Sequence, residues 1–282
     1  MAARLLAAGH LAVVWNRNAG RADGLISAGA LMADSPAQAV QLVDIVCLCL
    51  TDDAAVRTVT FGERGIVSGL TSGGPPPLIV DFSTSSPAAA QSLARDYRAA
   101  TGGAWLDAPV SGGVQRAEEG SLIAYCGGGE REFTRAQPIF EALTSRATLM
   151  GPSGSGQATK LIAQLIAAPT LVAIAEALAT AEALGLVPNR LIDVYAGALV
   201  DSPLLRTFGR RMATRQSEPR IGAIATMRKD IDNAVAMAIA AGASVPFAAA
   251  AAEIFRSIER TGGSSEEITA LMEHYSPRPS GD

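Results

Sequence analysis

The stretch Gly151-Pro152-Ser153-Gly154-Ser155-Gly156 divides the 282-residue chain into two halves with different patterns. Before it, short apolar runs rich in β-branched residues, such as residues 45–50 and 78–82, alternate with helical patterns. This alternation predicts βαβ units and a parallel sheet. After it, Ala-rich helical patterns follow one another and β-branched runs nearly vanish. The sequence therefore predicts an α/β domain over residues 1–153, an all-α domain over residues 154–276 and a tail over residues 277–282.

The first residues resemble the interior of a known folding unit. Residues 1–8 form a helical pattern closed by Gly9, and residues 11–15 form a strand pattern. A Rossmann-type dinucleotide-binding domain opens with a strand, a G-x-G-x-x-G turn and a helix whose N-terminus faces the pyrophosphate. We therefore expect an α/β domain of Rossmann type that is incomplete at its start and lacks the glycine turn.

Composition excludes several classes of protein. Hydrophobic residues make up 49% and charged residues 18% of the chain, which is typical of a packed globular protein and excludes a disordered one. The three cysteines, Cys47, Cys49 and Cys126, are too few for a disulfide framework and lack metal-ligand spacing. With only His10 and His274, neither a metal site nor a Ser-His-Asp triad is expected. Cys47 and Cys49 lie in an apolar run, and we expect both to pack in the core.

Charge and hydropathy disfavour nucleic-acid and membrane partners. The formal net charge is −4 and no block of like charge is present. The longest apolar stretch, residues 161–175, contains Gln164 and Pro169 and is followed by Glu176, which predicts a buried helix and no membrane span. The first residues do not have the pattern of a secretory leader, so we expect a cytoplasmic protein.

The run Trp105-Leu106-Asp107-Ala108-Pro109-Val110-Ser111-Gly112-Gly113 is a candidate binding segment. Two glycines after a serine leave backbone N–H groups accessible, and such a turn can hold a carboxylate without a charged side chain. An ordinary surface loop is the alternative interpretation of Ser111, Gly112 and Gly113.

Two lysines stand out in the helical half. Lys160 and Gln164 are four residues apart, so they project from one face of an apolar helix. A lysine there needs a partner or a function, and desolvation would suit it to proton transfer, although its ammonium could also extend to solvent. Lys229 and Asp230 are adjacent on another apolar helix, where neighbours do not face each other, so a solvated face is expected.

Asn16-Arg17-Asn18 follows the first predicted strand. In a dinucleotide-binding fold this position contacts the adenosine ribose, and an arginine there favours a 2′-phosphate because a guanidinium pairs with phosphate through two hydrogen bonds. A surface arginine is the alternative.

Together these segments resemble the β-hydroxyacid dehydrogenase family, from residue 1 to about residue 275. Four signatures occur in the family's order: Asn16-Arg17-Asn18, the Asp107 to Gly113 run, the glycine-rich run that leads to Lys160, and Lys229-Asp230. The combination of the second signature with a correctly spaced lysine is specific to this family.

The resemblance implies an oxidoreductase that interconverts a small 3-hydroxy acid and its semialdehyde, of the 3-hydroxyisobutyrate or 2-hydroxy-3-oxopropionate type, in a homodimer or homotetramer. Lys160 would be the general acid/base. A small carboxylate-bearing substrate would be held by Ser111, Gly112, Gly113 and Gln164. The cofactor, NADP(H) in preference to NAD(H), would contact Asn16, Arg17, Leu50, Thr51, Thr84 and Lys229.

The chain also departs from the family pattern. Ala163 stands where many relatives have asparagine, while Gln164 can still bond a substrate hydroxyl. Arg116 adds an unusual charge near the expected carboxylate site. Two alternatives remain open: an imine reductase-like enzyme, which the presence of Lys160 disfavours, and a catalytically impaired interaction protein on the same scaffold.

Overall fold

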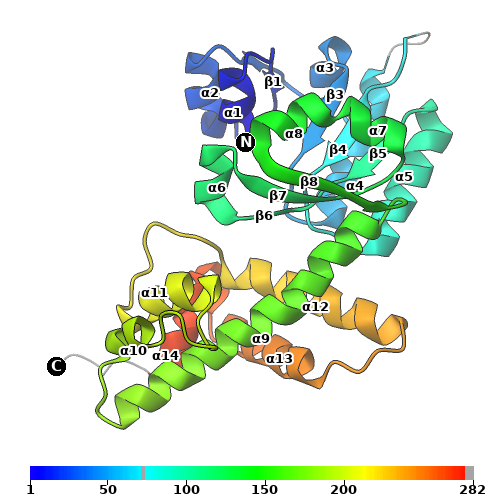
Figure 1. Cartoon of the computed structure of the whole chain (residues 1–282). Helices are drawn as coiled ribbons and strands as arrows, with labels where there is room; N and C mark the ends of the chain where they lie inside the picture. The colour runs from blue at the N-terminus through cyan, green and yellow to red at the C-terminus, as the bar shows by residue number, and fades with distance from the viewer. Residues whose placement is uncertain (71–73, 277–282) are drawn as a thin grey trace. The chain divides into compact units, whose positions relative to one another are not determined.

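The computed structural model describes residues 1–70 and 74–276, and these divide into two compact units, one up to Lys160 and one from Leu161 onward (Figure 1). We call them the sheet unit and the helical unit. The sheet unit is an α/β Rossmann-type domain and the helical unit is all-α, as the sequence predicts. The predicted tail, residues 277–282, lies outside the described residues.

The main sheet of the sheet unit is mixed, with strand order β3-β4-β5-β7-β6 and β8 beside β7. The first three strands are parallel, β7 is antiparallel to β5 and β6, and β8 is parallel to β7. The expected parallel sheet is therefore confirmed for β3, β4 and β5 and wrong where β7 joins β5 and β6, because the chain between β6 and β7 returns in the opposite direction. The strands are β3 (Ile45–Leu48), β4 (Leu78–Asp81), β5 (Trp105–Asp107), β6 (Val110–Ser111), β7 (Leu122–Gly127) and β8 (Thr144–Gly151).

A second, two-stranded parallel sheet lies in the same unit. It pairs β1 (Val13–Val14) with β2 (Leu31–Met32). β1 is shorter than the predicted strand over residues 11–15, and Leu11 is almost fully exposed.

Helices cover both faces of the main sheet. Along β4, Leu78 and Val80 pack in one cluster with Phe140, whereas Ile79 packs in another cluster with Leu93. This alternation is the period of two expected of a strand buried on both faces. The helices of the unit are α1 (Ala2–Ala7), α2 (Asp23–Ser27), α3 (Pro36–Ala39), α4 (Asp53–Phe61), α5 (Pro87–Thr101), α6 (Gly113–Glu119), α7 (Glu130–Arg135) and α8 (Gln137–Leu143).

Strand β3 buries only part of its apolar run, with Leu48 in the core. Cys47 and Cys49 are both exposed, so the prediction that they pack in the core is wrong. The reason is position in the sheet: among the described residues, β3 is the last strand of its sheet on that side. The pattern of an apolar run cannot distinguish such an edge strand from a central one.

The helical unit is built around α9 (Ser155–Ala183), which begins in the sheet unit. Of the described residues, α9 is the one helix long and apolar enough to cross a membrane by length and composition, yet Leu171, Ala175 and Leu178 are core residues of this unit. The other helices are α10 (Pro188–Val194), α11 (Arg210–Ala213), α12 (Ile224–Ala240), α13 (Pro246–Arg260) and α14 (Leu271–Tyr275).

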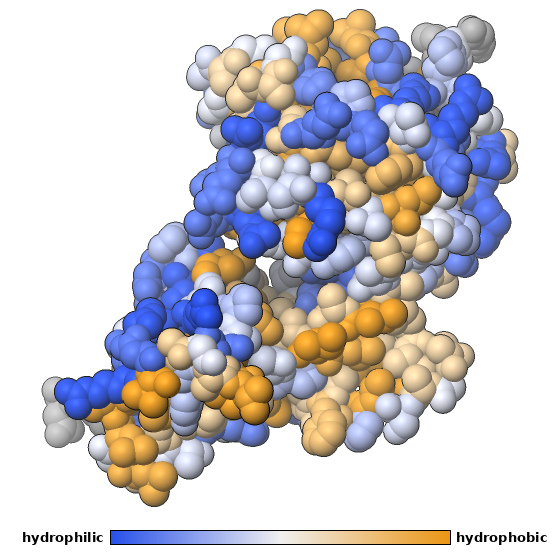
Figure 2. All heavy atoms as spheres, viewed as in Figure 1, coloured by the Kyte–Doolittle hydropathy of each residue, from blue (hydrophilic) through white to orange (hydrophobic). Residues whose placement is uncertain are grey.

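Several apolar side chains of the helical unit are exposed. Ile162 and Ile166 lie near the start of this unit, and Leu184, Leu186 and Val187 follow the end of α9. Figure 2 shows orange, apolar atoms at that end of the unit. Helix α9 therefore carries apolar side chains, Ile162 and Ile166, outside the face that packs in the core.

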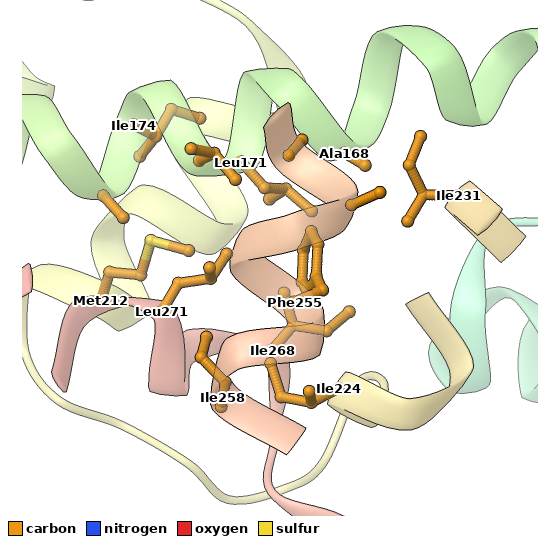
Figure 3. Packing of buried hydrophobic residues seen from close by; sticks show 14 of the residues in the cluster. Ala168, Leu171, Ile174, Met212, Ile224, Ile231, Phe255, Ile258, Ile268 and Leu271 are labelled. Carbon is orange, nitrogen blue, oxygen red and sulfur yellow. The ribbon is translucent and has the colours of Figure 1, made fainter. Parts of the chain in front are cut away.

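The core of the helical unit is formed almost entirely by apolar side chains (Figure 3). Phe255 of α13 is fully buried and lies among residues from α9, α12 and the last turns of the chain. The buried residues labelled around it are Ala168, Leu171, Ile231, Ile268 and Leu271.

Candidate functional site

The ends of three neighbouring parallel strands define one edge of the main sheet. β3 leads to Leu50 and Thr51, and β4 leads to Ser83 and Thr84. The Leu50 N–H donates a hydrogen bond of 2.9 Å to Ser83 Oγ. Two turns that carry predicted cofactor residues are therefore joined, at the edge where open α/β sheets bind nucleotides.

Strands β4 and β5 each end in a buried aspartate. Asp81 of β4 is paired in register with Asp107 of β5, and both are fully buried. Asp81 Oδ1 accepts a hydrogen bond of 3.0 Å from the Ser83 N–H, and among the described residues Asp81 Oδ2 has no hydrogen-bond partner. Burial raises the pKa of Asp81 to about 7, with a smaller contribution from Asp107 and a partial offset by Ser83.

Asp107 fastens the start of α9 to the sheet. Its Oδ1 accepts from the Gly154 N–H at 2.8 Å, and its Oδ2 accepts from the Gln157 N–H at 3.1 Å. The carboxylate thus satisfies N–H groups of the first helical turn, as a capping side chain does, although it comes from a distant strand. Burial raises the pKa of Asp107, and the bonds from Gly154 and Gln157 oppose this change.

Two positions around Asp107 must be glycine, because neighbouring segments approach them too closely for a side chain. A Cβ on Gly127 would lie 2.6 Å from Asp107 Oδ2, and a Cβ on Gly156 would lie 2.3 Å from the Tyr125 carbonyl oxygen. Both distances are shorter than a real Cβ contact. The glycine-rich run before Lys160 therefore lets the start of α9 lie directly against β5 and β7.

Lys160 lies one helical turn after Gln157 and is half-buried. Its place on α9 is set by the hydrogen bonds between Asp107 and the preceding turn. The predicted proton-transfer residue therefore stands on a part of the helix that is anchored to the sheet.

The predicted carboxylate-binding turn lies between β6 and α6. Gly112 and Gly113 have φ values of 132° and 70°, in the region that favours glycine. The aliphatic part of Arg116 folds over Gly112, since a Cβ there would lie 2.6 Å from Arg116 Cδ. Ser111 is paired with Ile123 of β7. The structure thus explains the two glycines and places the Arg116 stem against their turn.

The helical unit holds its own buried polar group. Gln164 Nε2 donates to Asp230 Oδ2 at 2.8 Å, and Lys229 Nζ lies 3.3 Å from Asp230 Oδ1. Gln164 and Asp230 are buried. The expectation that Lys229 and Asp230 lie on a solvated face and do not meet is wrong, because the flexible lysine stem curls back to its neighbour.

Asn16 and Arg17 follow β1, in the two-stranded sheet, and are exposed. The Asn16 side chain accepts a hydrogen bond of 2.9 Å from the Asn18 N–H, which closes a local turn. These residues therefore belong to a different sheet from Leu50, Thr51 and Thr84.

Sequence reasoning missed three residues that organise these turns. It assigned no role to Asp107, Gln157 or Asp230, although each is a polar residue in an otherwise apolar pattern. That signal could have identified them as buried and bonded, but the identity of their partners depends on the fold. Among residues 1–70 and 74–276, no group of His, Cys, Asp and Glu could hold a metal ion.

The fold and the joined turns define a Rossmann-type domain of the kind that binds dinucleotides, followed by a helical second domain. Residues 1–151 match the NAD binding domain of 6-phosphogluconate dehydrogenase, and residues 154–275 match the NAD-binding domain of NADP-dependent 3-hydroxyisobutyrate dehydrogenase. The chain belongs to the β-hydroxyacid dehydrogenase family, a family of NAD(P)-dependent enzymes.

Individual relatives agree with this assignment. The chain is 36% identical over 252 residues to 2-hydroxy-3-oxopropionate reductase of Escherichia coli (strain K12), which covers 89% of this chain and 85% of that protein. The crystal structure of 3-hydroxyisobutyrate dehydrogenase from Salmonella typhimurium is 28% identical, with a TM-score of 0.87 and coverage of 97% of this chain and 94% of that chain. The Mycobacterium tuberculosis 3-hydroxyisobutyrate dehydrogenase with L-serine is 28% identical, with a TM-score of 0.84 and coverage of 98% and 94%.

Proposed function

We propose that this protein is an oxidoreductase that prefers NADP(H) and interconverts a small 3-hydroxy acid and its semialdehyde. The observation that carries the proposal is the Asp107 carboxylate, which joins the strand of the Asp107 to Gly113 run to the helix that bears Lys160. Two family signatures thereby become one structural unit. The names of the relatives indicate substrates of the 3-hydroxyisobutyrate or 2-hydroxy-3-oxopropionate type.

The residues at the end of the sheet fit the nicotinamide end of such a cofactor. The joined turns place Leu50 and Thr51 beside Ser83 and Thr84, at the edge where nucleotides bind to open α/β sheets. When bound, the pyridine nucleotide supplies or accepts a hydride. Arg17 would pair with the 2′-phosphate of NADP(H), with Asn16 beside it. This contact is the basis of the proposed preference for NADP(H) over NAD(H). We also propose that Lys229 contacts the cofactor, as the family resemblance implies.

Lys160 would move the proton. In the reducing direction it donates a proton to the substrate oxygen, and in the oxidising direction it takes that proton from the hydroxyl group. The Lys160 side chain is half-buried on α9, and an ammonium in that place carries N–H groups that can be given to a substrate oxygen.

Other residues would orient the substrate. The backbone N–H groups at Ser111, Gly112 and Gly113 would hold its carboxylate. Because Gln164 Nε2 donates to Asp230, its Oε1 is the atom left to accept a hydrogen bond from the substrate hydroxyl. Asp230 therefore decides which end of the Gln164 amide serves the substrate.

The proposal extends to assembly and location. The exposed apolar side chains Ile162, Ile166 and Leu184 support association of copies into a homodimer or homotetramer. The net charge of −4 disfavours nucleic-acid and anionic-membrane partners, and we extend the proposal to a cytoplasmic protein.

Substitution of Lys160 tests the proposal. We expect Lys160→Ala to lower kcat by about 10²-fold or more for reduction of 2-hydroxy-3-oxopropionate or the semialdehyde of 3-hydroxyisobutyrate, as expected for loss of a general acid. Thr159→Ala is the control, because it removes only the bond from Thr159 Oγ1 to the Ser155 carbonyl oxygen at the adjacent position.

Two results would contradict the proposal. If Lys160→Ala keeps most of its turnover, Lys160 is not the proton-transfer residue. If the unaltered protein turns over neither semialdehyde with NADPH or NADH, the dehydrogenase function itself fails, and activity on cyclic imines or the absence of cofactor binding would select between the alternatives.

A further inference from the structure

Gln157 makes an unusual pair of side-chain contacts. Its Oε1 accepts a hydrogen bond of 2.9 Å from the Ser85 N–H, and its Nε2 donates a hydrogen bond of 2.8 Å to the Ser83 carbonyl oxygen. These two backbone groups flank Thr84. Gln157 is fully buried, so neither bond competes with solvent. One amide side chain therefore holds the turn on both sides of Thr84.

The main chain of Gln157 is fixed as well. Its N–H donates to Asp107 Oδ2 at 3.1 Å, beside the bond from Gly154 to Asp107 Oδ1. Ser83 in turn accepts from the Leu50 N–H. A continuous set of hydrogen bonds thus connects the ends of β3, β4 and β5 to the first turn of α9.

Because Gln157 lies on α9, this set of hydrogen bonds also links the Thr84 turn to the helix that carries Lys160. Lys160 lies three residues further along the helix, one turn away. Any shift of the Thr84 turn relative to that helical turn must break buried hydrogen bonds, and a buried donor or acceptor left without a partner is costly. The structure therefore ties the position of Thr84 to the position of Lys160.

The chemistry of glutamine suits this task. Its side chain carries one acceptor and two donors on the same amide, so it can accept from one peptide group and donate to another at once. Leucine has nearly the same size and neither function. Asparagine has the functions on a side chain one methylene shorter.

We propose that Gln157 is a positioning residue that fixes the Thr84 turn against the helical turn bearing Lys160, so that cofactor and proton donor meet the substrate in one geometry. This inference rests on the proposed function. Its effect is exerted on the chemical step and on cofactor affinity, because misplacement of the Thr84 turn costs rate by misaligning reacting groups and also shifts residues assigned to the cofactor. Substrate affinity, assigned to the Ser111 to Gly113 turn, depends on residues that Gln157 does not contact through these bonds.

The experiment compares Gln157→Leu with a matched loss of one buried hydrogen bond elsewhere in the sheet unit. The control is Tyr97→Phe, since the fully buried Tyr97 donates its hydroxyl to the Pro77 carbonyl oxygen at 2.9 Å, before β4 begins. For Gln157→Leu we expect kcat to fall by about tenfold or more, while KM for the semialdehyde changes by less than about twofold. We also expect a larger deuterium isotope effect with NADPH deuterated at the transferred position. Tyr97→Phe is expected to keep the kcat and isotope effect of the unaltered protein.

Other outcomes overturn the inference. Equal kcat values for Gln157→Leu and Tyr97→Phe, or a loss of kcat without a change in the isotope effect, mean that Gln157 is only structural. Where Gln157→Leu does not fold, Gln157→Asn replaces it, with the same expectation and the same criterion for rejection.

The failure of the proposed function can be told apart from the failure of this inference. The dissociation constant for NADPH, followed by fluorescence, needs no turnover. If the unaltered protein binds NADPH but reduces no semialdehyde, the proposed function fails, and a several-fold weaker binding in Gln157→Leu than in Tyr97→Phe still supports a role in placing Thr84. Equal binding in that case overturns the role.

Discussion

The two units differ in where their buried polar groups lie and what they bond. In the sheet unit, Asp81, Asp107 and Gln157 are fully buried at one edge of the sheet and are bonded to backbone groups of neighbouring turns. In the helical unit, the centre is apolar around Phe255, and the buried polar side chains include Gln164 bonded to Asp230, Arg211 bonded to the Pro219 carbonyl oxygen and Glu267 bonded to the Thr269 N–H. The sheet unit gathers buried hydrogen bonds at one edge, whereas the helical unit packs its helices around an apolar centre.

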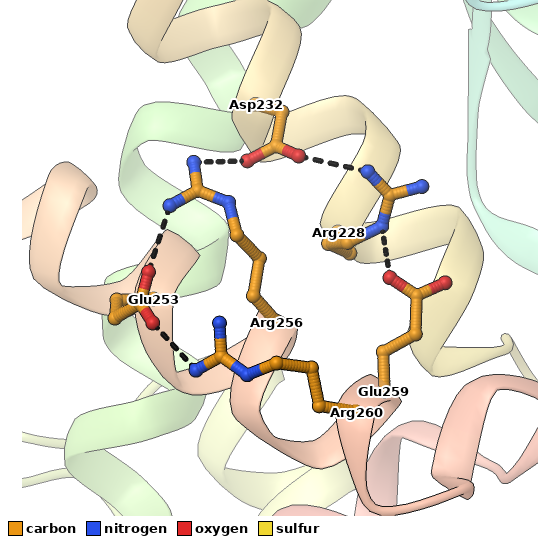
Figure 4. Close-up of polar contacts among 6 residues, drawn as sticks. All are labelled: Arg228, Asp232, Glu253, Arg256, Glu259 and Arg260. Atoms are coloured by element: carbon orange, nitrogen blue, oxygen red, sulfur yellow. Dashed lines mark hydrogen bonds and ion pairs between the residues drawn. The ribbon is translucent and has the colours of Figure 1, made fainter.

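Charges of the helical unit form a network on the surface instead (Figure 4). Asp232 of α12 accepts from Arg228 at 2.8 Å and from Arg256 of α13 at 2.7 Å. Arg256 also binds Glu253 at 2.9 Å, and Glu253 binds Arg260 at 2.7 Å. These side chains are partly exposed, so the network adds less stability than its length suggests.

This contrast teaches where each unit is sensitive. Removal of volume should damage the helical unit, and changes in protonation should affect the sheet unit. Surface charge should matter little in either. Both tryptophans, Trp15 and Trp105, lie in the sheet unit, so fluorescence follows that unit, whereas circular dichroism follows the helices of both units.

The largest effect is expected from Phe255→Ala. Removal of this fully buried ring should destabilise the helical unit by about 3–5 kcal/mol, because burial is lost and a cavity remains. In urea, part of the loss of helical circular dichroism should move to lower denaturant, while the tryptophan transition stays in place. Phe247→Ala on the same helix is the control, since Phe247 is 83% exposed. An equal shift of both transitions would show that the two units unfold as one, which would break the comparison.

An intermediate effect is expected from Asp81→Asn and depends on pH. Burial raises the pKa of Asp81 from 3.8 to about 7 in the folded protein. Between these pH values the folded state keeps a proton that the unfolded state has released, so the stability due to Asp81 is complete below the lower value and is lost as pH rises toward about 7. The loss is at most roughly 1.4 kcal/mol for each pH unit.

Asp81→Asn should remove this part of the pH dependence, because asparagine stays neutral and its side-chain oxygen can still accept from Ser83. The measurement is the free energy of unfolding from tryptophan fluorescence at several pH values from 4 to 7. Glu63→Gln, at an exposed position, controls for the change in net charge. Identical slopes for Asp81→Asn and the unaltered protein would show that Asp81 is ionised throughout.

The smallest effect is expected from Arg256→Ala. Its side chain is 40% exposed, and loss of its two ion pairs should cost no more than about 1 kcal/mol. The cost should shrink further in 1 M salt, where such pairs are screened. Urea unfolding followed by circular dichroism at low and high salt measures both values, with Arg190→Ala on α10 as the control. A loss of more than about 2 kcal/mol that salt does not reduce would contradict this prediction, because only buried ion pairs are expected to behave in that way.

Local patterns predicted much of the fold. Ser35 and Ser86 cap the helices that follow them, and such caps can be recognised in the sequence because an N-cap needs only its own side chain and an N–H three residues away. β4 was identified from its apolar run, and α9 from its long apolar helical pattern. β8 was missed, since Thr144 to Gly151 alternates exposed and half-buried residues and has no continuous apolar run.

The candidate site was predictable in part. The family resemblance locates Lys160 and the Ser111 to Gly113 turn. The structure adds the reasons for the glycines: close approach to the sheet requires Gly156 before Lys160, and positive φ values favour Gly112 and Gly113 in the turn. The resemblance did not locate Gln157, whose contact with Ser85 joins residues 72 positions apart. Nothing near Gln157 in the chain identifies that partner.

The α/β and all-α halves, most helices and the family therefore follow from the amino-acid sequence alone, because each depends on periodicity, caps or short signatures among neighbours in the chain. The tertiary structure decided the mixed direction of the sheet, the exposure of Cys47 and Cys49, and the hydrogen bonds that connect Thr84 and Asp107 to the start of α9. The physical reason is that edge or centre in a sheet, and the partner of a buried polar group, are set by which distant segments come together.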